Sequence, residues 1–328
     1  MISGGIGAIV GLIFTRLNPN PTLSGPNSYG LFAACAAAVV AALVAAIGYW
    51  RSRNRVGQEW RQELARWTFA VNTISVVIVH TALAFLGAYV LFFVLSVALG
   101  GFSVLTFFGT LMMALTLGIT TYLVFPSVAR MNTQRTSSLL MAFVVLGTLT
   151  SAVTTSDPLW WKEHFSQLGT YNDVSSWIFN GTLIAGGLLV TTFAVYISHD
   201  MHALVSEGRL SDSSSPRTVS GLFVIMGLML VGVGLFPVDV SFWIHTLSAS
   251  GMAVVYLMLL IGGRRYLSGM PRTYFVASWL FLAAILGALV LYLVKYFSLT
   301  AFEVVVFALI FGWIAVFIRF LGAAGQRD

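Results

Sequence analysis

Ionisable side chains inside long apolar segments are the first candidates for chemistry in this 328-residue chain. His80 lies near the middle of an apolar segment, Glu303 lies near the start of the last one, and Lys295 ends the segment before it. Charged groups in hydrocarbon are costly, and they commonly serve ion pathways, proton relays or ion pairs. We therefore expect one of two outcomes. The three residues are ion- or proton-linked groups, or His80 bonds a neighbouring helix and Lys295 pairs with Glu303.

A second set of polar and aromatic residues falls at the ends of three apolar segments: Asp173, Trp177, Asn180, Asp239 and His245. Charge distribution places these ends on the same side of a membrane, as shown below. We expect the five residues to line an outward-facing polar pocket in which Asp173, Asp239 and His245 meet. The alternative is structural, because Asp173 suits a helix N-cap and tryptophan commonly anchors helices at the membrane interface.

Enzymatic chemistry finds little support in the residue pattern. His164 could join Asp173, Asp239 and His245 as a metal ligand, but the chain has no HExxH-type spacing. Phosphate-cradling and nucleophile-elbow motifs are absent from the sequence as well. We therefore expect no catalytic residues, no metal and no cofactor, and the sequence favours a non-enzymatic protein while leaving enzymatic activity open.

Composition defines the elements that must position these residues. Hydrophobic residues make up 58% of the chain and charged residues 9%, whereas soluble domains average roughly 25% charged residues. A globular core cannot bury so much apolar surface. The composition excludes a soluble enzyme or a disordered scaffold and predicts an all-α, polytopic integral membrane bundle.

Nine segments are long and apolar enough for membrane-spanning helices, which need about 20 residues each. A tenth apolar segment, residues 2–15, is short, and it either crosses the membrane or inserts partly. Its Gly7 and Gly11 form a small-residue face suited to packing on a neighbouring helix. The nine predicted spans are 31–50, 70–99, 102–126, 137–155, 177–197, 219–237, 241–263, 273–295 and 299–321.

The basic residues cluster in alternate loops. This asymmetry is the positive-inside pattern, so it orients the chain and explains the net charge of +6 without a nucleic-acid partner. Loop 51–66 alone contains five arginines, and its Glu59 and Glu63 stand at helical intervals that predict a short surface helix. The C-terminus is then cytoplasmic. The loops predicted to lie outside are 16–30, 100–101, 156–176, 238–240 and 296–298.

Several short motifs resemble a known membrane family. They are Ser166-Gln-Leu-Gly169, Trp177-Ile-Phe-Asn180, Gly186-Gly187, and Phe236-Pro-x-Asp239 followed by His245. Over residues 137–322 this pattern is similar to bacterial domain-of-unknown-function relatives of the Frag/DRAM/Sfk proteins. The resemblance implies a six-helix core with signature residues on the extracytoplasmic side, and eukaryotic relatives act in lipid remodelling and organisation. Residues 1–136, with three full spans and the short apolar segment, lie outside it, and 137–328 form the predicted core.

These observations lead to three functional hypotheses. The first is a protein that binds or organises lipid or envelope components through the pocket of Asp173, Trp177, Asn180, Asp239 and His245. The second is a secondary transporter or channel that uses His80, Glu303 and Lys295. The third is a structural subunit of a membrane complex. We expect membrane lipids as partners, a further membrane protein bound through the N-terminal helices, and a location in a plasma membrane, which the Ala-, Gly- and Val-rich composition suggests is bacterial.

Overall fold

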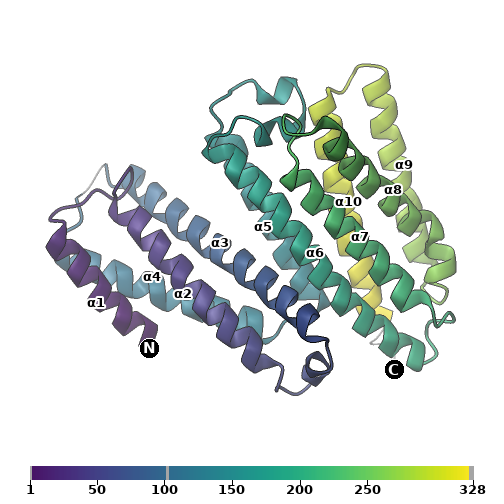
Figure 1. Ribbon diagram of the computed structural model, residues 1–328, viewed down its shortest axis with the longest axis horizontal. Helices are drawn as coiled ribbons and strands as arrows, with labels where there is room; N and C mark the ends of the chain where they lie inside the picture. Colours follow the sequence, from purple (N-terminus) through teal and green to yellow (C-terminus); the bar gives the residue numbers. More distant parts are fainter. Residues whose placement is uncertain (1, 101–102, 325–328) are drawn as a thin grey trace. The chain divides into compact units, whose positions relative to one another are not determined.

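The computed structural model describes residues 2–100 and 103–324, and these residues are overwhelmingly helical. Within them, the one isolated β-bridge joins Thr22 and Ser103. The chain separates into two compact units, Met1–Met131 and Asn132–Asp328. Figure 1 shows the helices of each unit in sequence colours.

The described residues of the first unit, 2–100 and 103–131, form four α-helices, and small residues allow these helices to pack closely. Helix α2 packs against both α3 and α4, and α1 packs on α4. The buried face of α2 is lined with alanine, including Ala33, Ala37 and Ala41, and small side chains let helix backbones approach closely within a membrane. The elements are α1 (Ile2–Leu17), α2 (Tyr29–Ser52), the short 3-10 helix η1 (Glu59–Gln62), α3 (Arg66–Ala98) and α4 (Thr106–Ala129).

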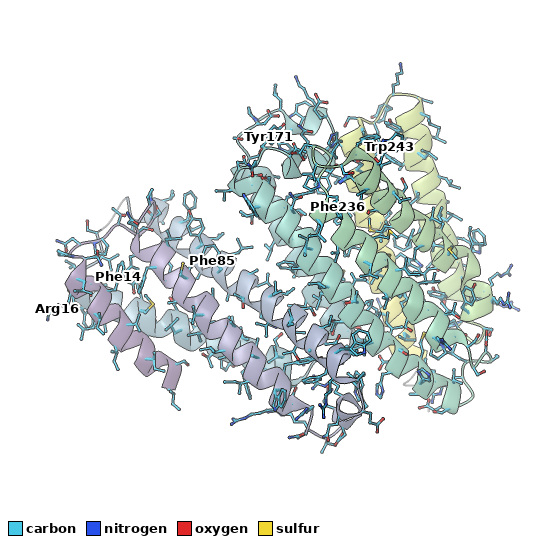
Figure 2. The ribbon with its side chains drawn as sticks, in the orientation of Figure 1. Phe14, Arg16, Phe85, Tyr171, Phe236 and Trp243 are labelled. Atoms are coloured by element: carbon cyan, nitrogen blue, oxygen red, sulfur yellow. The ribbon has the colours of Figure 1, made fainter. Side chains whose placement is uncertain are left out.

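Helix α1 is formed by the short apolar segment at the start of the chain. The small-residue face predicted for it is confirmed, because a Cβ on Gly7 would lie 2.6 Å from the Met113 carbonyl oxygen of α4. Phe14 follows on the same helix, and it stacks on Phe32 with ring centroids 4.1 Å apart. Both Phe14 and Phe85 pack against the buried core of this unit (Figure 2).

Loop 51–66 departs from its predicted surface helix. Only η1 forms there, because Gly57 adopts a φ of 78° and turns the chain out of a helical path. Arg61 then points inward and is buried, with 1% of its surface exposed.

Six α-helices lie in the described part of the second unit, residues 132–324. Helices α5, α6, α7 and α8 pack in sequence order, and α10 packs against α9 and α5. Residues 155–173, which include two short 3-10 helices, connect α5 to α6. The elements are α5 (Thr133–Thr154), the 3-10 helices η2 (Trp160–Lys162) and η3 (Phe165–Gly169), α6 (Val174–Ser206), α7 (Ser215–Leu235), α8 (Phe242–Tyr266), α9 (Arg272–Leu293) and α10 (Leu299–Ala324).

Glycines bring α6 and α7 close together. A Cβ on Gly187 would lie 2.5 Å from the Gly227 carbonyl oxygen, and one on Gly227 would lie 2.7 Å from that of Gly187. Because the obstructing atoms are backbone atoms, no side chain can rotate away to make room. The α6–α7 crossing therefore depends on glycine at both positions.

Nine helices in the described part of the chain, α2 through α10, are long and apolar enough to cross a membrane. Each one contains or overlaps a predicted span, which confirms the predicted fold class: an all-α polytopic membrane bundle. Large apolar side chains such as Val153, Leu247 and Leu280 are exposed on the outer faces of these helices. Such faces suit a lipid solvent, in which apolar exposure carries no penalty.

Helix α6 is considerably longer than its predicted span of 177–197. Its 33 residues correspond to about 50 Å of helix, whereas a bilayer core is about 30 Å thick. In the polar end of α6, Asp200 accepts a hydrogen bond from the Thr133 hydroxyl of α5. His202 adds a bond from its Nδ1 to the Ser198 carbonyl at 2.7 Å.

Candidate functional site

The segment between α5 and α6 covers one end of the second unit. Asp173 begins α6 as its N-cap: its Oδ1 accepts the Ser176 N–H at 2.9 Å, and its Oδ2 accepts the Ser156 hydroxyl at 2.7 Å. Partial desolvation tends to raise the pKa of Asp173, but the hydrogen bonds to its charged form outweigh this and leave the pKa below its ordinary value. Asp173 therefore fixes where the covering segment joins α6.

A second carboxylate holds the covering segment in shape. The Tyr171 hydroxyl donates to Asp157 Oδ2 at 2.5 Å, and Gln167 Nε2 donates to the Tyr171 oxygen at 2.9 Å. The bond from Tyr171, supported by the Leu159 N–H, lowers the pKa of Asp157. Tyr171, Phe236 and Trp243 all lie toward this end of the unit (Figure 2).

Beneath the covering segment lies a cavity of about 360 Å³. Its walls come from α6, α7, α8, α9 and α10, and η3 closes one end. This volume falls in the range of pockets that hold small molecules, roughly 300–1,000 Å³. Most of the lining is aliphatic or aromatic, and the polar side chains that line it are Ser166, His245, Ser250, Tyr256 and Glu303.

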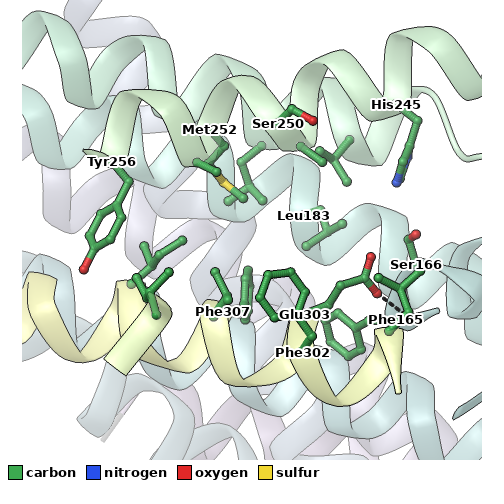
Figure 3. A pocket seen from close by; sticks show the side chains of 18 of the residues that line it. Phe165, Ser166, Leu183, His245, Ser250, Met252, Tyr256, Phe302, Glu303 and Phe307 are labelled. Atoms are coloured by element: carbon green, nitrogen blue, oxygen red, sulfur yellow. Dashed lines mark hydrogen bonds between the residues drawn. The ribbon is translucent and has the colours of Figure 1, made fainter. Parts of the chain in front are cut away.

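The histidine and the carboxylate that line the cavity, His245 and Glu303, lie at the same end of it (Figure 3). Figure 3 shows His245, Ser166 and Glu303 near one another at this end, with Tyr256 at the far end. His245 is the fourth residue of α8 and Glu303 is the fifth of α10. The cavity thus has an imidazole and a carboxylate at the end covered by η3, a mainly apolar middle, and the Tyr256 hydroxyl at the far end (Figure 3).

Glu303 also connects the covering segment to α10. Its Oε2 accepts the backbone N–H of Phe165 at 2.6 Å, a short charge-assisted hydrogen bond (Figure 3). The Phe165 ring packs on Phe179 of α6 and Phe307 of α10, with centroid separations of 5.3 Å and 6.0 Å. Phe165 therefore contributes to both parts of the cavity: its ring packs into the apolar wall, and its backbone N–H bonds the carboxylate at the polar end.

His245 has a defined hydrogen-bonding state on one side of its ring. Nδ1 lies 3.0 Å from the Phe236 carbonyl oxygen, and a carbonyl only accepts, so Nδ1 carries the proton. In the neutral ring Nε2 is then an acceptor, and in the protonated ring it is a donor. His245 and Glu303 do not pair with each other: the salt bridge found within the described residues joins Arg209 and Glu207.

His164 stands at the edge of this polar end, outside the spans. Its Nδ1 lies 3.0 Å from the Ser166 hydroxyl oxygen. Desolvation, reinforced by the nearby His245, lowers the pKa of His164, while Glu163 partly opposes the shift. The surroundings of this end therefore favour a neutral His164.

The five residues expected to form one polar pocket are not brought together. Of Asp173, Trp177, Asn180, Asp239 and His245, His245 alone lines the cavity. The Asp173 oxygens are engaged by Ser156 and Ser176, and Asn180 Nδ2 donates to the Gly169 carbonyl at 2.9 Å. Trp177 points away from the core with 73% of its surface exposed, and Asp239 lies exposed in the turn after α7. Asp173, Asp239 and His245 therefore do not line one pocket, contrary to the sequence-based expectation.

The other expected residues, His80, Glu303 and Lys295, are divided between the two units. His80 lies in the first unit and is buried, with Nδ1 bonded to the Val76 carbonyl at 2.8 Å and Nε2 to the Ser127 hydroxyl at 2.9 Å. Glu303 lies in the second unit. Lys295 is exposed and has a φ of 61°, and the expected ion pair with Glu303 does not form, because Glu303 bonds Phe165 instead.

Sequence reasoning missed Ser166, Tyr256 and the apolar wall as parts of one site. Ser166 was noted only as part of a motif, and Tyr256 stands in an apolar stretch without any distinguishing pattern. No group of three or more His, Cys, Asp or Glu residues suited to a metal occurs in the portion of the chain that the structure describes.

The fold and the site define a multi-pass helical membrane protein with an amphipathic cavity in its second unit. Residues 138–319 match the family described as "Protein of unknown function (DUF998)", and the chain belongs to that family. No curated protein and no solved structure matches the chain. The relationship to the Frag/DRAM/Sfk proteins stays a prediction.

Proposed function

We propose that this protein is a non-enzymatic integral membrane protein that binds an amphipathic lipid in the cavity of its second unit. The apolar chain of the lipid lies along α8 and α10, and its polar group lies near Ser166, His245 and Glu303. Among the residues predicted from sequence, His245 keeps its proposed ligand-binding role and Glu303 joins it.

The observation that carries this proposal is the arrangement of the cavity, in which an imidazole and a carboxylate stand at one end and a mainly apolar wall leads away from them. His245 and Tyr256 are eleven positions apart on α8, which corresponds to about 16 Å along a helix. Half of a bilayer core of about 30 Å is about 15 Å. A cavity that starts near the end of a spanning helix and extends this far matches one acyl chain of a single leaflet.

The chemistry of the polar end indicates what kind of group it would hold. A carboxylate accepts several hydrogen bonds, and Glu303 uses one oxygen for the Phe165 N–H. Ser166 both donates and accepts. A headgroup that carries ammonium, amide or hydroxyl donors suits this arrangement better than a bare anion, because an anion would face the Glu303 carboxylate.

The proposal also includes the cellular location of the protein and its relationship to other families. The arginine-rich loops lie on the side opposite the covering segment in the predicted topology, so the polar end would face the extracytoplasmic side of a plasma membrane, in our hypothesis a bacterial one. The resemblance to the Frag/DRAM/Sfk proteins supports a lipid-related role, since their eukaryotic members act on or organise lipids.

Native mass spectrometry of gently extracted protein, with identification of bound lipid, tests this proposal. Ala253 lines the cavity, whereas its neighbour Val254 is 55% exposed on the same helix. Ala253→Phe should fill the cavity and remove the bound lipid, and Val254→Phe should retain it. Equal lipid retention in both variants would refute lipid binding in the cavity.

A secondary transporter or channel is the alternative function, and one observation favours it: the Glu303 carboxylate lines a cavity between membrane-spanning helices. In this hypothesis Glu303 is the proton- or ion-linked group, whereas His80 and Lys295, which were expected to act with it, do not line this cavity. A pH-driven flux assay in reconstituted vesicles separates the two functions. Flux that Glu303→Gln abolishes supports transport, and a lipid-binding protein shows none.

A structural role in a membrane complex is the third hypothesis. It rests on the first unit, which lies outside the family match and exposes large apolar side chains such as Ile9, Val39 and Leu43. A further membrane protein would bind there. Removal of a specific co-purifying protein by substitutions on this face would support it.

A further inference from the structure

A second cavity, of about 610 Å³, lies in the first unit where α2 ends and α3 begins. Its lining includes three arginines, Arg53, Arg61 and Arg66, together with Gln62 and Trp50. No carboxylate lines it. Three guanidinium groups around one cavity form a strongly cationic site, and the segment 51–66 that supplies them carries five arginines against two glutamates, a net charge of +3.

Aromatic rings hold two of the guanidinium groups in place. Arg53 lies over the Trp50 ring at 4.2 Å, and Arg61 lies over the Tyr49 ring at 4.6 Å. Phe69 connects the two, with ring centroids 5.6 Å from Tyr49 and 5.8 Å from Trp50. Both arginines therefore rest on one continuous aromatic platform, and such stacking orients a guanidinium group without neutralising its charge.

Hydrogen bonds fix the turn that carries Arg61. The buried Arg61 donates from Nη2 to the Ser52 hydroxyl at 2.6 Å. Gln62 Nε2 donates to the Arg53 carbonyl at 3.0 Å and so ties η1 to the end of α2. Neither Arg53 nor Arg66 forms a salt bridge with a carboxylate within the described ranges 2–100 and 103–324.

The chemistry of this cavity indicates a phosphate group. Guanidinium forks match the geometry of phosphate oxygens and bind them through paired, charge-assisted hydrogen bonds. The cavity also lies where α2 ends and α3 begins, and both helices are long and apolar enough to cross a membrane. The ends of spanning helices reach the polar headgroup region of a bilayer. Basic clusters beside transmembrane helices bind anionic lipids. We propose that this cavity binds the phosphate of an anionic membrane lipid, on the side that the arginine-rich loops make cytoplasmic in the predicted topology.

Native mass spectrometry of the full chain reconstituted with phosphatidylglycerol and phosphatidylcholine tests the site. Arg53→Gln with Arg66→Gln should lower bound phosphatidylglycerol about tenfold or more, since each arginine near the surface strengthens anionic-lipid binding severalfold. The matched control is Arg217→Gln with Arg272→Gln, which removes two exposed arginines at the starts of α7 and α9. The control should bind phosphatidylglycerol as the unaltered protein does. Equal losses in both double variants, or no loss in either, would overturn the proposal.

Inorganic phosphate distinguishes a lipid headgroup from a free anion. Millimolar phosphate that binds the delipidated protein and displaces phosphatidylglycerol from it would assign the site to free phosphate and overturn the lipid assignment. Retention of phosphatidylglycerol under these conditions supports it. The Ala253→Phe variant of the second unit should keep the anionic lipid, so the two cavities can fail independently.

Discussion

The two units treat a buried histidine in opposite ways. In the first unit, both ring nitrogens of His80 form hydrogen bonds within the helix packing. The partners are the Val76 carbonyl of α3 and the Ser127 hydroxyl of α4. In the second unit, the His245 ring lines a cavity, and its Nδ1 alone is fixed by a backbone carbonyl. The same residue type is thus part of the packing in one place and part of a cavity wall in the other, so its position in a span does not by itself reveal its role.

The two units also differ in which helices their glycines bring together. In the first unit, glycines bring the short α1 onto α4, and in the second they bring the long α6 and α7 together beside the cavity. Phe179 and Leu183 of α6 and Leu230 and Val233 of α7 all line that cavity. The close α6–α7 crossing therefore positions one part of the cavity wall. Helices α8 and α10 supply other parts of it.

The largest effect should follow from disturbing this crossing. Gly187→Leu places side-chain atoms against backbone atoms of α7, and we expect a destabilisation of about 3 kcal/mol or more. Gly181→Leu is the matched control, because Gly181 lies on the same helix with open space around it. Thermal unfolding in detergent measures both. A Gly187→Leu midpoint equal to that of Gly181→Leu would show that the crossing does not hold the wall.

Replacing the two histidines tests the comparison directly. His80→Leu leaves the half-buried Ser127 hydroxyl and the buried Val76 carbonyl without their histidine partner and should destabilise the protein by about 2 kcal/mol. His245→Leu removes one backbone bond and should cost about 1 kcal/mol or less, while lowering lipid retention. Unfolding midpoints and native mass spectra on the two variants give both quantities. Loss of lipid from His80→Leu alone would reverse the roles assigned to the two residues.

Two substitutions of Glu303 separate its contact with Phe165 from its charge. Glu303→Gln keeps an acceptor oxygen for the Phe165 N–H, whereas Glu303→Ala removes it. Amide exchange at Phe165 should rise about tenfold in the alanine variant, as expected for a lost hydrogen bond of about 1.4 kcal/mol, and rise less in the glutamine variant. Hydrogen-exchange mass spectrometry measures this. Equal protection in both variants would mean that the aromatic contacts of Phe165 hold the covering segment unaided.

The smallest expected effect is a pH dependence that comes from His164. The folded protein lowers the pKa of His164 below its ordinary 6.5 through desolvation and the nearby His245. The unfolded chain therefore binds more protons just below pH 6.5, so the free energy of unfolding should decrease as the pH falls through this range. His164→Gln should flatten that slope between pH 7.5 and pH 5.5 in thermal unfolding. An unchanged slope would assign the dependence to another group.

Sequence alone was enough for the spans but not for the site. Apolar length predicts every spanning helix, because the membrane requires about 20 such residues for each helix. Which face of each helix packs against protein and which faces lipid was not predictable. Both surroundings are apolar, so the helices carry no amphipathic pattern. Trp177 and Phe179 show this: they stand two positions apart on α6, yet one is exposed and the other buried.

The partner of Glu303 illustrates the remaining gap. Its charge marks it as unusual within an apolar segment, and its neighbour Lys295 suggested an ion pair. The actual partner is a backbone N–H located 138 positions earlier in the chain. Such a donor has no side-chain signature, so only the folded arrangement of η3 on α10 reveals the contact.

The bond between Phe165 and Glu303 also makes the covering segment and any cavity ligand thermodynamically dependent on each other. A ligand that takes the same carboxylate oxygen must release the segment, and the affinity it loses equals the stability that the segment gains from the bond. By reciprocity, an outside partner that pins the segment in place weakens such a ligand by the same factor. The covering segment can thus transmit the occupancy of a cavity inside the membrane to a surface outside it.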